Sequence, residues 1–339
     1  MIINIIISIS LLAWLYLLVA HGRFWASTPE LPPAVPDERP DVDIIVPARD
    51  EAQHIRAVID SLLAQDYGGH FRLFLVDDNS TDGTAERAGS APDLRVIGGA
   101  PKPEGWSGKL WALHQGVAAS SAALLLFTDA DIVHDARHLS ALVARCLESK
   151  ADLVSEMVRL NCSSLAERAL VPAFVYFFQM LYPFARVNDP RARTAAAAGG
   201  TVLIRREALQ GIGGIESIKQ ALIDDVTLAK AIKARGAIYL AHSVLAASIR
   251  AYPQFRDLWR MIARTAFTQL RHSTALLALT VLGLMLVWLV PLSAALFAHG
   301  WARAARVVVS NTAAASPHTA DRITRPIGFL RPGASVARN

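Results

Sequence analysis

Two carboxylates, Asp129 and Asp131, follow closely on the apolar run at residues 123–127. The run has the composition of a strand that is buried on both faces. Ligands of open α/β sheets bind outside the carboxyl ends of the strands, and alternate residues of an extended segment point the same way. Both acids can therefore face one ligand, and hard oxygen donors at this spacing suit Mg²⁺ or Mn²⁺ carrying a diphosphate. The alternative is a turn in which Asp131 or Asp135 only caps the next helix.

Two further acidic pairs stand where a helix is predicted to begin. Asp77 and Asp78 follow the strand predicted at residues 71–76, whereas Asp224 and Asp225 open a predicted helix themselves. Ser80 or Thr81 is predicted to cap the first of these helices, and capping needs only one such residue, so Asp77 and Asp78 are free to accept hydrogen bonds from a base or a ribose. For the second pair, an N-cap followed by a first-turn acid that the helix dipole favours is the alternative interpretation.

Lys109 stands at the start of the helix predicted at residues 110–119. The helix dipole disfavours a cation at this end, so a bound phosphate would explain the lysine, and a solvated side chain is the alternative. Gly199 and Gly200 precede the strand predicted at residues 201–204 and permit a close backbone approach to a ligand.

The elements that must position these residues alternate along the chain. Strands are predicted at 42–47, 71–76, 94–97 and 123–128, with helices between them. This alternation predicts an α/β fold with a doubly wound, mostly parallel sheet. Asp50 and Gln53 have the spacing of a capping box, which predicts a helix start at this place.

The composition also indicates membrane-spanning segments. The chain has 339 residues, of which 53% are hydrophobic, and its mean hydropathy of +0.33 is too high for an ordinary soluble enzyme. Residues 2–20 and 274–298 carry no charge and are long enough to span a bilayer. The first lacks a basic start and a clear cleavage site, so we interpret it as an anchor and not as a cleaved signal peptide.

The charged and sulfur-containing residues exclude other classes of protein. The net charge of +5 comes without a Lys/Arg block that has interleaved aromatics, so no nucleic-acid partner is expected. The surplus suits an anionic membrane surface or a phosphorylated substrate. Cys146 and Cys162 have no metal-like spacing, which indicates neither a zinc site nor a disulfide framework.

The domain organisation follows from these segments. Residues 254–273 form a predicted basic amphipathic helix, and residues 169–185 an apolar, aromatic helix that is either buried or interfacial. The arginines of the basic helix fall near one face and suit contact with phosphates or headgroups. They are Arg256, Arg260, Arg264 and Arg271. The predicted units are a transmembrane anchor at 1–22, a Pro-rich linker at 23–41, a catalytic domain at 42–253, the basic helix at 254–273, a transmembrane segment at 274–298 and a disordered tail at 299–339.

Charge also predicts the membrane topology. No basic residue precedes the first span and Arg23 follows it, so the positive-inside rule places the domain on the cytoplasmic face of the inner membrane. A single crossing of the second span would put Arg303 and Arg306 outside, against the rule. A re-entrant hairpin bent at Pro291 is the alternative.

Four motifs together carry a family resemblance. They are Val46-Pro-Ala-Arg-Asp-Glu51, Val76-Asp-Asp-Asn-Ser-Thr-Asp-Gly-Thr84, Gly108-Lys109 and Thr128-Asp-Ala-Asp131. In this order they resemble the nucleotide-binding half of family 2 glycosyltransferases with the GT-A fold, and the resemblance covers about residues 42–271. The flanking membrane segments are similar to those of the hopene-associated subgroup, which is thought to act on lipids.

The resemblance implies a membrane-bound inverting glycosyltransferase that uses a nucleotide sugar, a divalent metal and a lipid acceptor, with a hopanoid as one candidate. By position, Asp225 would be the general base, with Asp224 in place of the usual Glu, and Asp129 and Asp131 would hold the metal. Relatives often carry a Gln/Arg-x-x-Arg-Trp motif here, which would supply the diphosphate contact. This chain lacks the motif at residues 264–271, and we take Arg264 as the first choice for that contact. The nucleotide-sugar site would comprise Pro47, Arg49, Glu51, Asp77, Asp78, Lys109, Asp129, Gly200 and Arg264.

Two rival functions differ in what they require. A sugar nucleotidyltransferase shares the doubly wound core but needs a Gly-rich loop after the first strand, where this chain has Pro47-Ala-Arg-Asp50. A non-catalytic membrane scaffold would need no acidic groups at the ends of its strands and helices.

Overall fold

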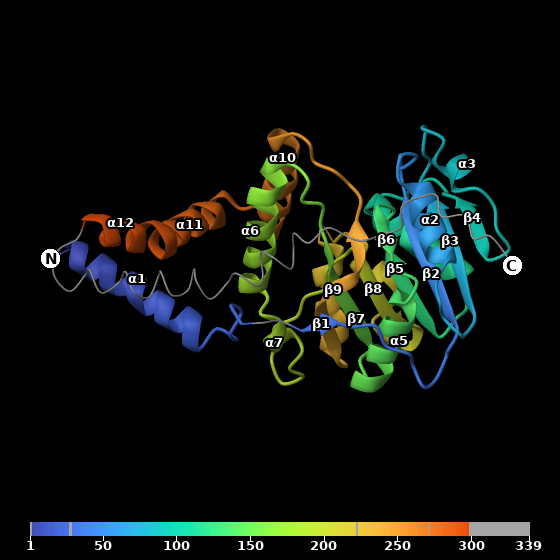
Figure 1. Ribbon diagram of the computed structural model, residues 1–339, viewed down its shortest axis with the longest axis horizontal. Coiled ribbons are helices and arrows are strands. Elements are labelled where there is room, and N and C mark those ends of the chain that lie inside the picture. Colours follow the sequence, from blue (N-terminus) through green and yellow to red (C-terminus); the bar gives the residue numbers. More distant parts are fainter. Residues whose placement is uncertain (1, 27–28, 222, 271, 298–339) are drawn as a thin grey trace, which may run out of the picture.

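A computed structural model describes residues 2–26, 29–221, 223–270 and 272–297. The tail predicted at 299–339 and Arg271 lie outside these residues. One end of the molecule is a sheet with helices on both faces, and α1, α11 and α12 extend from the other end (Figure 1). The strands are β1 Glu30–Leu31, β2 Val42–Ala48, β3 Phe71–Asp77, β4 Leu94–Gly98, β5 Leu124–Thr128, β6 Ile132–His134, β7 Leu153–Arg159, β8 Thr201–Arg205 and β9 Ile238–Ser248. The helices are α1 Ile2–Val19, α2 Ile55–Leu63, α3 Thr84–Ala88, α4 Gly108–Ala119, α5 His138–Ser149, α6 Leu165–Leu181, α7 Phe184–Val187, α8 Arg206–Gly211, the 3-10 turn η1 Ile215–Ile218, α9 Asp224–Lys233, α10 Phe255–Gln269, α11 Thr274–Leu284, the π-helical turn η2 Met285–Leu289 and α12 Val290–Phe297.

The described strands form one nine-stranded sheet in the order β1-β9-β7-β8-β5-β2-β3-β4, with β6 paired to β9. The block β5-β2-β3-β4 is parallel, as are the pairs β7–β9 and β1–β9. Only β8 and β6 run antiparallel to their neighbours among these strands. The predicted α/β class with a mostly parallel, doubly wound sheet is confirmed.

Strand β5 shows why the sheet has a core on each face. All five of its residues are buried, because successive side chains point to opposite faces and both faces are covered. Leu125 and Phe127 join the cluster under α4 and α9, while Leu124 and Leu126 join the cluster under α2 and α5. Full burial of such a side chain contributes about 1.5–3 kcal/mol.

Helix α4 lies close against β2 because it presents a glycine there. A Cβ added at Gly116 would stand only 2.4 Å from Cγ2 of Ile45. This close approach fixes the height of α4 above the sheet, and with it the position of Lys109 in the first turn of the helix.

The predicted Pro-rich linker does more than connect two parts of the chain, since its β1 adds to the edge strand β9 and Leu31 is buried in the core. One local prediction is wrong. Asp50 does not cap a helix, because α2 begins only at Ile55. Its carboxylate instead accepts a hydrogen bond of 2.8 Å from the backbone of Thr81, so it joins the loops that follow β2 and β3.

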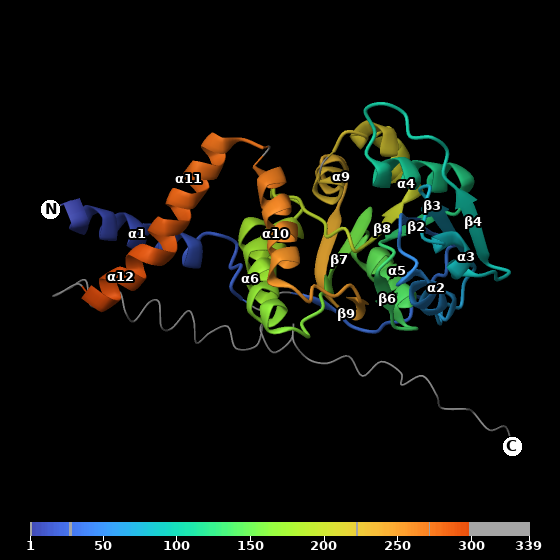
Figure 2. The same ribbon diagram turned by 90° about the horizontal axis from the view of Figure 1, so that it is seen from above.

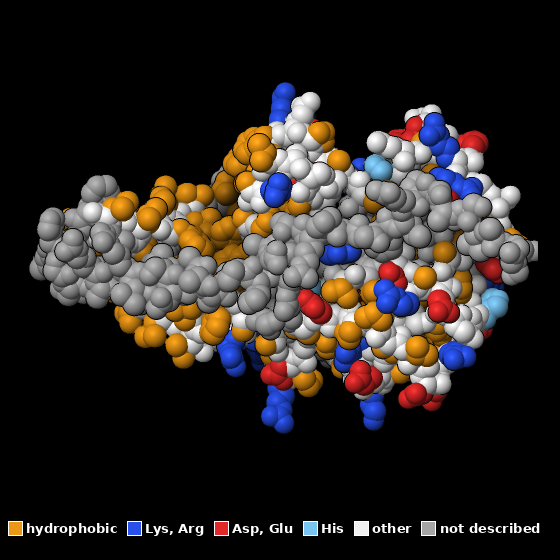
Figure 3. Space-filling model, in the orientation of Figure 1, with side chains coloured by type: hydrophobic (Ala, Val, Ile, Leu, Met, Phe, Trp, Pro, Cys, Tyr) orange, Lys and Arg blue, Asp and Glu red, His pale blue; other side chains and the backbone are white. Residues whose placement is uncertain are grey.

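Within the residues that the structure describes, two helices are long and apolar enough to cross a membrane: Ile2–Val19 and Thr274–Ala294. Hydrophobic side chains gather on the surface over α1 and α11 (Figure 3), and α11, η2 and α12 follow one another along a single rod (Figure 2). The hairpin alternative is therefore wrong for residues 274–297, because Pro291 does not reverse the chain.

Helix α1 pairs with this rod at the place that Pro291 disturbs. Proline has no N–H, so a carbonyl one turn earlier loses its helical partner. The indole of Trp14 donates a 2.6 Å hydrogen bond to the carbonyl of Val287, and Ser10 donates one of 2.8 Å to that of Leu286. The polar side chains of α1 thus satisfy carbonyls exposed by the π-helical turn.

Candidate functional site

A cleft of about 740 Å³ opens where β2, β3 and β5 end, and α10 closes its far side. Its lining contains most of the residues that the sequence predicted for a nucleotide-sugar site. They are Pro47, Arg49, Glu51, Asp78, Lys109, Asp129, Asp131 and Arg264. Asp77, Gly200, Asp224 and Asp225 are not part of this lining, and the last three lie in adjoining cavities.

The loops after β2 and β3 form one end of the cleft. Asp78 is buried, and its carboxylate lies 3.4 Å from the Arg49 guanidinium. Gly108 permits this packing, since a Cβ there would come within 2.8 Å of the same carboxylate. Asp77, the last residue of β3, is not part of the cleft lining, whereas the next residue, Asp78, is. The structure therefore gives the predicted role of Asp77 no support.

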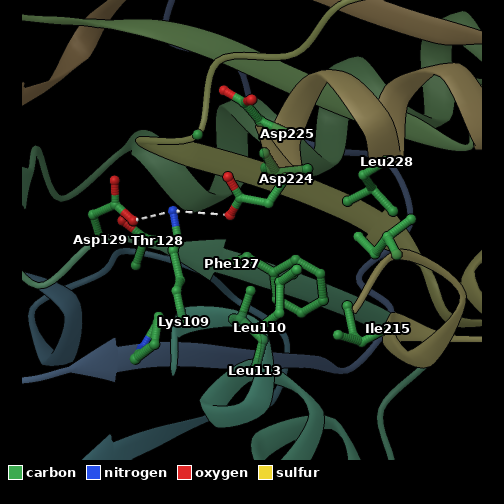
Figure 4. Close-up of a pocket in the computed structure, with 14 residues that line it drawn as sticks. Lys109, Leu110, Leu113, Phe127, Thr128, Asp129, Ile215, Asp224, Asp225 and Leu228 are labelled. Atoms are coloured by element: carbon green, nitrogen blue, oxygen red, sulfur yellow. Dashed lines mark ion pairs between the residues drawn. The ribbon is translucent and has the colours of Figure 1, made fainter. Parts of the chain in front are cut away.

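The Lys109 ammonium lies between two carboxylates, 2.7 Å from Asp129 and 3.3 Å from Asp224 (Figure 4). Desolvation opposes the charge on Lys109, but these carboxylates outweigh it and raise the pKa of the lysine. Desolvation, with the neighbouring Asp131 and Asp224, raises the pKa of Asp129 against the opposing effect of Lys109. The phosphate that the sequence suggested is therefore not needed to explain a lysine at this helix start.

Arg250 joins two acids of the cleft that the sequence had treated separately. Its guanidinium donates to Asp131 at 2.6 Å and also forms an ion pair with Glu51. Sequence reasoning missed this residue. It stands two residues beyond the end of β9, so the strand-end argument that selected the acids could have found it.

Asp225 stands at the start of α9, where its carboxylate points away from Lys109 (Figure 4). Burial and the neighbouring carboxylate of Asp224 raise the pKa of Asp225 to about 7. A carboxyl group with this pKa exchanges a proton readily at neutral pH, as a general base must. A Cβ at Gly199 would lie 3.3 Å from its Oδ2, so the glycine leaves this carboxylate accessible.

A second cavity of about 270 Å³ adjoins the first and is mostly apolar. Asp129, Asp131 and Arg250 line both spaces, whereas Asp225 lines only the second of the two. Gly200 also lines it, and its carbonyl accepts a 3.3 Å hydrogen bond from the backbone of Asp129. Its apolar walls come from β7 and the residue after it, from α6 and from α10, through Met157, Val158, Leu160, Val171, Phe174, Phe178 and Met261.

Helix α10 carries two of its arginines, Arg260 and Arg264, into the first cleft, and Tyr252 also lines it. Arg256 of the same helix is not part of this lining. The Tyr182 hydroxyl of α6 donates a 2.9 Å hydrogen bond to Gln269 of α10, so these two helices hold each other at the mouth of the second cavity.

The carboxylates permit one kind of metal site. Within the described part of the chain, no three His, Cys, Asp or Glu side chains converge to hold an ion. Asp129 and Asp131 supply two hard oxygen donors beside the cleft. Two carboxylates suit Mg²⁺ or Mn²⁺ when substrate phosphates complete the coordination, so the donor set fits a metal that binds together with a diphosphate.

Comparison with known proteins agrees with this arrangement. Residues 43–213 match the family described as glycosyl transferase family 2. O-antigen biosynthesis protein RfbC of Myxococcus xanthus is 27% identical over 217 residues, which cover 58% of this chain and 16% of that protein. An uncharacterized glycosyltransferase of Mycobacterium tuberculosis is 34% identical over 114 residues, 34% of this chain and 47% of that protein. The matches thus span less than half the length of either relative.

Among solved structures, the mannosyltransferase PcManGT from Pyrobaculum calidifontis, in complex with GDP-Man and Mn²⁺, has a similar fold. Its TM-score is 0.57 at 21% identity, with 94% of this chain and 89% of that chain covered. The family model covers half of the chain and spans β2 to β8, including Asp78, Lys109 and Asp129. The chain therefore belongs to glycosyl transferase family 2.

Proposed function

We propose that the protein is a membrane-bound inverting glycosyltransferase that moves a sugar from a nucleotide sugar to a hydroxyl group of a lipid. The observation that carries this proposal is the junction of the two cavities. Asp129 and Asp131 line both the polar cleft and the apolar cavity, and Asp225 opens onto the apolar one. A donor and an apolar acceptor can therefore meet beside one carboxylate base.

The donor would occupy the polar cleft. Asp78 and Arg49 would contact the nucleoside, and Arg260 and Arg264 would face the diphosphate. The solved mannosyltransferase of similar fold binds GDP-Man and Mn²⁺, which supports a nucleotide sugar and a divalent cation as ligands of this chain. Asp129 and Asp131 would hold the cation, which when bound stabilises the negative charge of the leaving diphosphate.

Asp225 would perform the proton transfer. As the acceptor oxygen bonds to the anomeric carbon, the bond from that carbon to the diphosphate oxygen breaks and the nucleoside diphosphate leaves with the electron pair. The hydroxyl proton passes to the Asp225 carboxylate. Attack from the side opposite the leaving group inverts the configuration, and the base is needed because a neutral hydroxyl is a weak nucleophile.

The pH dependence of turnover tests this role. Only the deprotonated form of Asp225 accepts a proton, so its raised pKa makes activity low in acid and high in base. We expect kcat/KM to rise with pH through an apparent pKa of about 7 and to level off above it. Asp225→Asn should remove this dependence from the residual rate. A wild-type rate that is constant between pH 5 and 8 would contradict the assignment.

The acceptor would occupy the second cavity. Its walls of Met, Val, Leu and Phe side chains suit an apolar chain or ring system, and α6 and α10 stand between the sheet and the two candidate membrane helices (Figure 1). An acceptor that enters from the bilayer would bring its hydroxyl to Asp225. A hopanoid is one lipid of this kind.

Calorimetric titration tests the proposal directly. UDP and GDP are each titrated into the purified protein in detergent, with and without Mn²⁺. We expect one of them to bind, and to bind more tightly with the metal. Binding of neither nucleotide would contradict the proposed function. If one nucleotide binds, mass spectrometry of lipids from cells with and without the gene identifies the glycosylated acceptor.

We further propose that the domain faces the cytoplasm, where nucleotide sugars are made. Ser90 is exposed at the end of α3, so a cysteine there, with Cys162 changed to Ser, reports the side of the domain. A membrane-impermeant maleimide should label Ser90→Cys only after the cells are permeabilised. Labelling of intact cells would place the domain outside.

A further inference from the structure

The two residues on either side of the segment that carries Asp129 and Asp131 are joined through their side chains. Thr128, the last residue of β5, and His134, the last residue of β6, flank this loop. The Thr128 hydroxyl lies 3.1 Å from Nε2 of His134 and 3.0 Å from the carbonyl oxygen of Gly200. Gly200 in turn accepts from the backbone of Asp129, so these contacts tie the end of β5, where the Asp129 loop begins, to the start of β8.

A buried chain of titratable groups continues from the contact between Thr128 and His134. Nδ1 of His134 lies 2.8 Å from Nδ1 of His138, and Nε2 of His138 lies 2.5 Å from Oε2 of Glu156. Thr128, His134, His138 and Glu156 are each at most 3% exposed. None of the three ionisable groups lines either cavity, so the proposed reaction makes no use of them.

The hydrogen bond to Gly200 fixes the direction of the whole chain. A carbonyl oxygen only accepts, so the single hydroxyl hydrogen of Thr128 must point to Gly200. Nε2 of His134 then has to carry a hydrogen that it donates to Thr128. Burial, together with the nearby His138, lowers the pKa of His134 well below its usual value, so this ring is neutral and its Nδ1 is an acceptor. His138 must therefore donate from its own Nδ1.

The last link then requires a proton that is shared. With Nδ1–H assigned as donor, His138 either accepts at Nε2 from a protonated Glu156 or is an imidazolium that donates to a carboxylate. Both forms hold one proton more than a neutral imidazole beside a carboxylate, and both make the pair neutral overall. This matches its burial, because an isolated charge is costly in such a place.

The opposite direction is disfavoured on two grounds. It would have His138 donate to an ionised Glu156, leaving a net negative charge in the core, where Oε1 of Glu156 has no hydrogen-bond partner among the described residues. The 3.2 Å hydrogen bond from Ser243 would be the only other polar contact that the structure gives this carboxylate. It would also turn the Thr128 hydrogen toward His134, so that two oxygen lone pairs would face each other at 3.0 Å.

We infer that His138 and Glu156 hold one buried proton between them and so direct a one-way hydrogen-bond chain, through His134 and Thr128 to Gly200, that positions the loop of Asp129 and Asp131 for the nucleotide-sugar donor. All four side chains are positioning residues. The direction of the chain rests on the hydrogen-bond geometry together with the neutrality of the buried His134 ring, whereas its effect on the donor rests on the proposed function.

Nitrogen NMR tests the direction independently of any ligand. In full-length protein labelled with [¹⁵N]histidine, the ring nitrogens of His134 and His138 are assigned from spectra of His134→Gln and His138→Gln. The expected result is hydrogen on Nε2 and not on Nδ1 of His134, and hydrogen on Nδ1 of His138. Hydrogen on Nδ1 of His134 with a bare Nε2 would overturn the inference.

Nucleotide binding tests the effect. Thr128→Val keeps the shape of the side chain but removes the hydroxyl that contacts His134 and Gly200. We expect Mn²⁺-dependent affinity for UDP or GDP to fall about tenfold, because a buried donor on His134 loses its partner. Thr128→Ser should restore most of the affinity.

Thr201 supplies a matched control. It is the residue paired with Thr128 across β5 and β8, it is equally buried, and its hydroxyl has no partner among the described residues. Thr201→Val should therefore leave affinity within about twofold. Equal losses in both valine variants, or no loss in Thr128→Val, would overturn the positioning role. A wild-type protein that binds neither nucleotide would refute the proposed function instead, and the NMR result would still decide the direction of the chain.

Discussion

Replacing Asp225 with Asn is expected to lower turnover by about two to four powers of ten, the usual contribution of a general base. Asparagine has nearly the same shape but cannot accept the acceptor's proton. Asp225 does not line the polar cleft, so nucleotide affinity in the presence of Mn²⁺ should stay near that of the wild type. Single-turnover transfer rates and calorimetric titration of the same preparation measure the two quantities separately.

The variant Asp60→Asn is the control for the chemical change itself. Asp60 is exposed on α2, where its side chain pairs with Arg56, and it lines neither cavity. Its turnover should match the wild type. If Asp225→Asn lost nucleotide binding while each bound complex still reacted at the normal rate, Asp225 would belong to the donor site and another group would be the base.

The strand-end acids could be predicted because their signals are local. A run such as residues 123–127 is a buried strand wherever it stands, and a carboxylate that follows it must lie at the edge of the sheet. Asp78, Asp129 and Asp131 all reach the cleft by this rule. The same rule could not choose between Asp77 and Asp78, since only the strand's final orientation decides which of two consecutive side chains points inward.

The partners of these acids could not be predicted because they come from distant parts of the chain. Arg250 meets Glu51 although 199 residues separate them. Lys109 was placed correctly at a helix start, but one carboxylate beside it follows β5 and the other begins α9, and the approach of these two elements depends on the whole sheet. Sequence patterns indicate which residues lie at the edge of the sheet, and tertiary packing decides which of these residues contact one another.

The pairing of the linker with the sheet could not be predicted for the same reason. Five prolines between residues 29 and 40 favour an extended chain, and the segment is extended, but an extended chain can also pair with an open edge. Strand β9 offers such an edge, and β1 occupies it through Glu30 and Leu31. The buried side chain of Leu31 then fixes the linker to the domain.

Asp131→Asn is expected to weaken Mn²⁺-dependent nucleotide binding by about tenfold to a hundredfold, the range found when groups that tune a metal site are changed. The amide keeps one oxygen but loses the negative charge that would attract the cation. Binding measured without metal should change much less, because the base and ribose contacts are proposed to lie at the other end of the cleft, near Asp78 and Arg49.

Two features separate this effect from a loss of structure. Arg250 keeps its ion pair with Glu51 when Asp131 is neutral, so the guanidinium retains one of its two acidic partners and the thermal midpoint should shift little. Asp135→Asn changes an acid four residues away that pairs with Arg137 and lies outside both cavities, so its metal-dependent affinity should equal that of the wild type. Unchanged nucleotide affinity of Asp131→Asn in the presence of Mn²⁺ would show that Asp131 serves to hold Arg250 and not a metal, and would leave Asp129 as the carboxylate to which the cation binds.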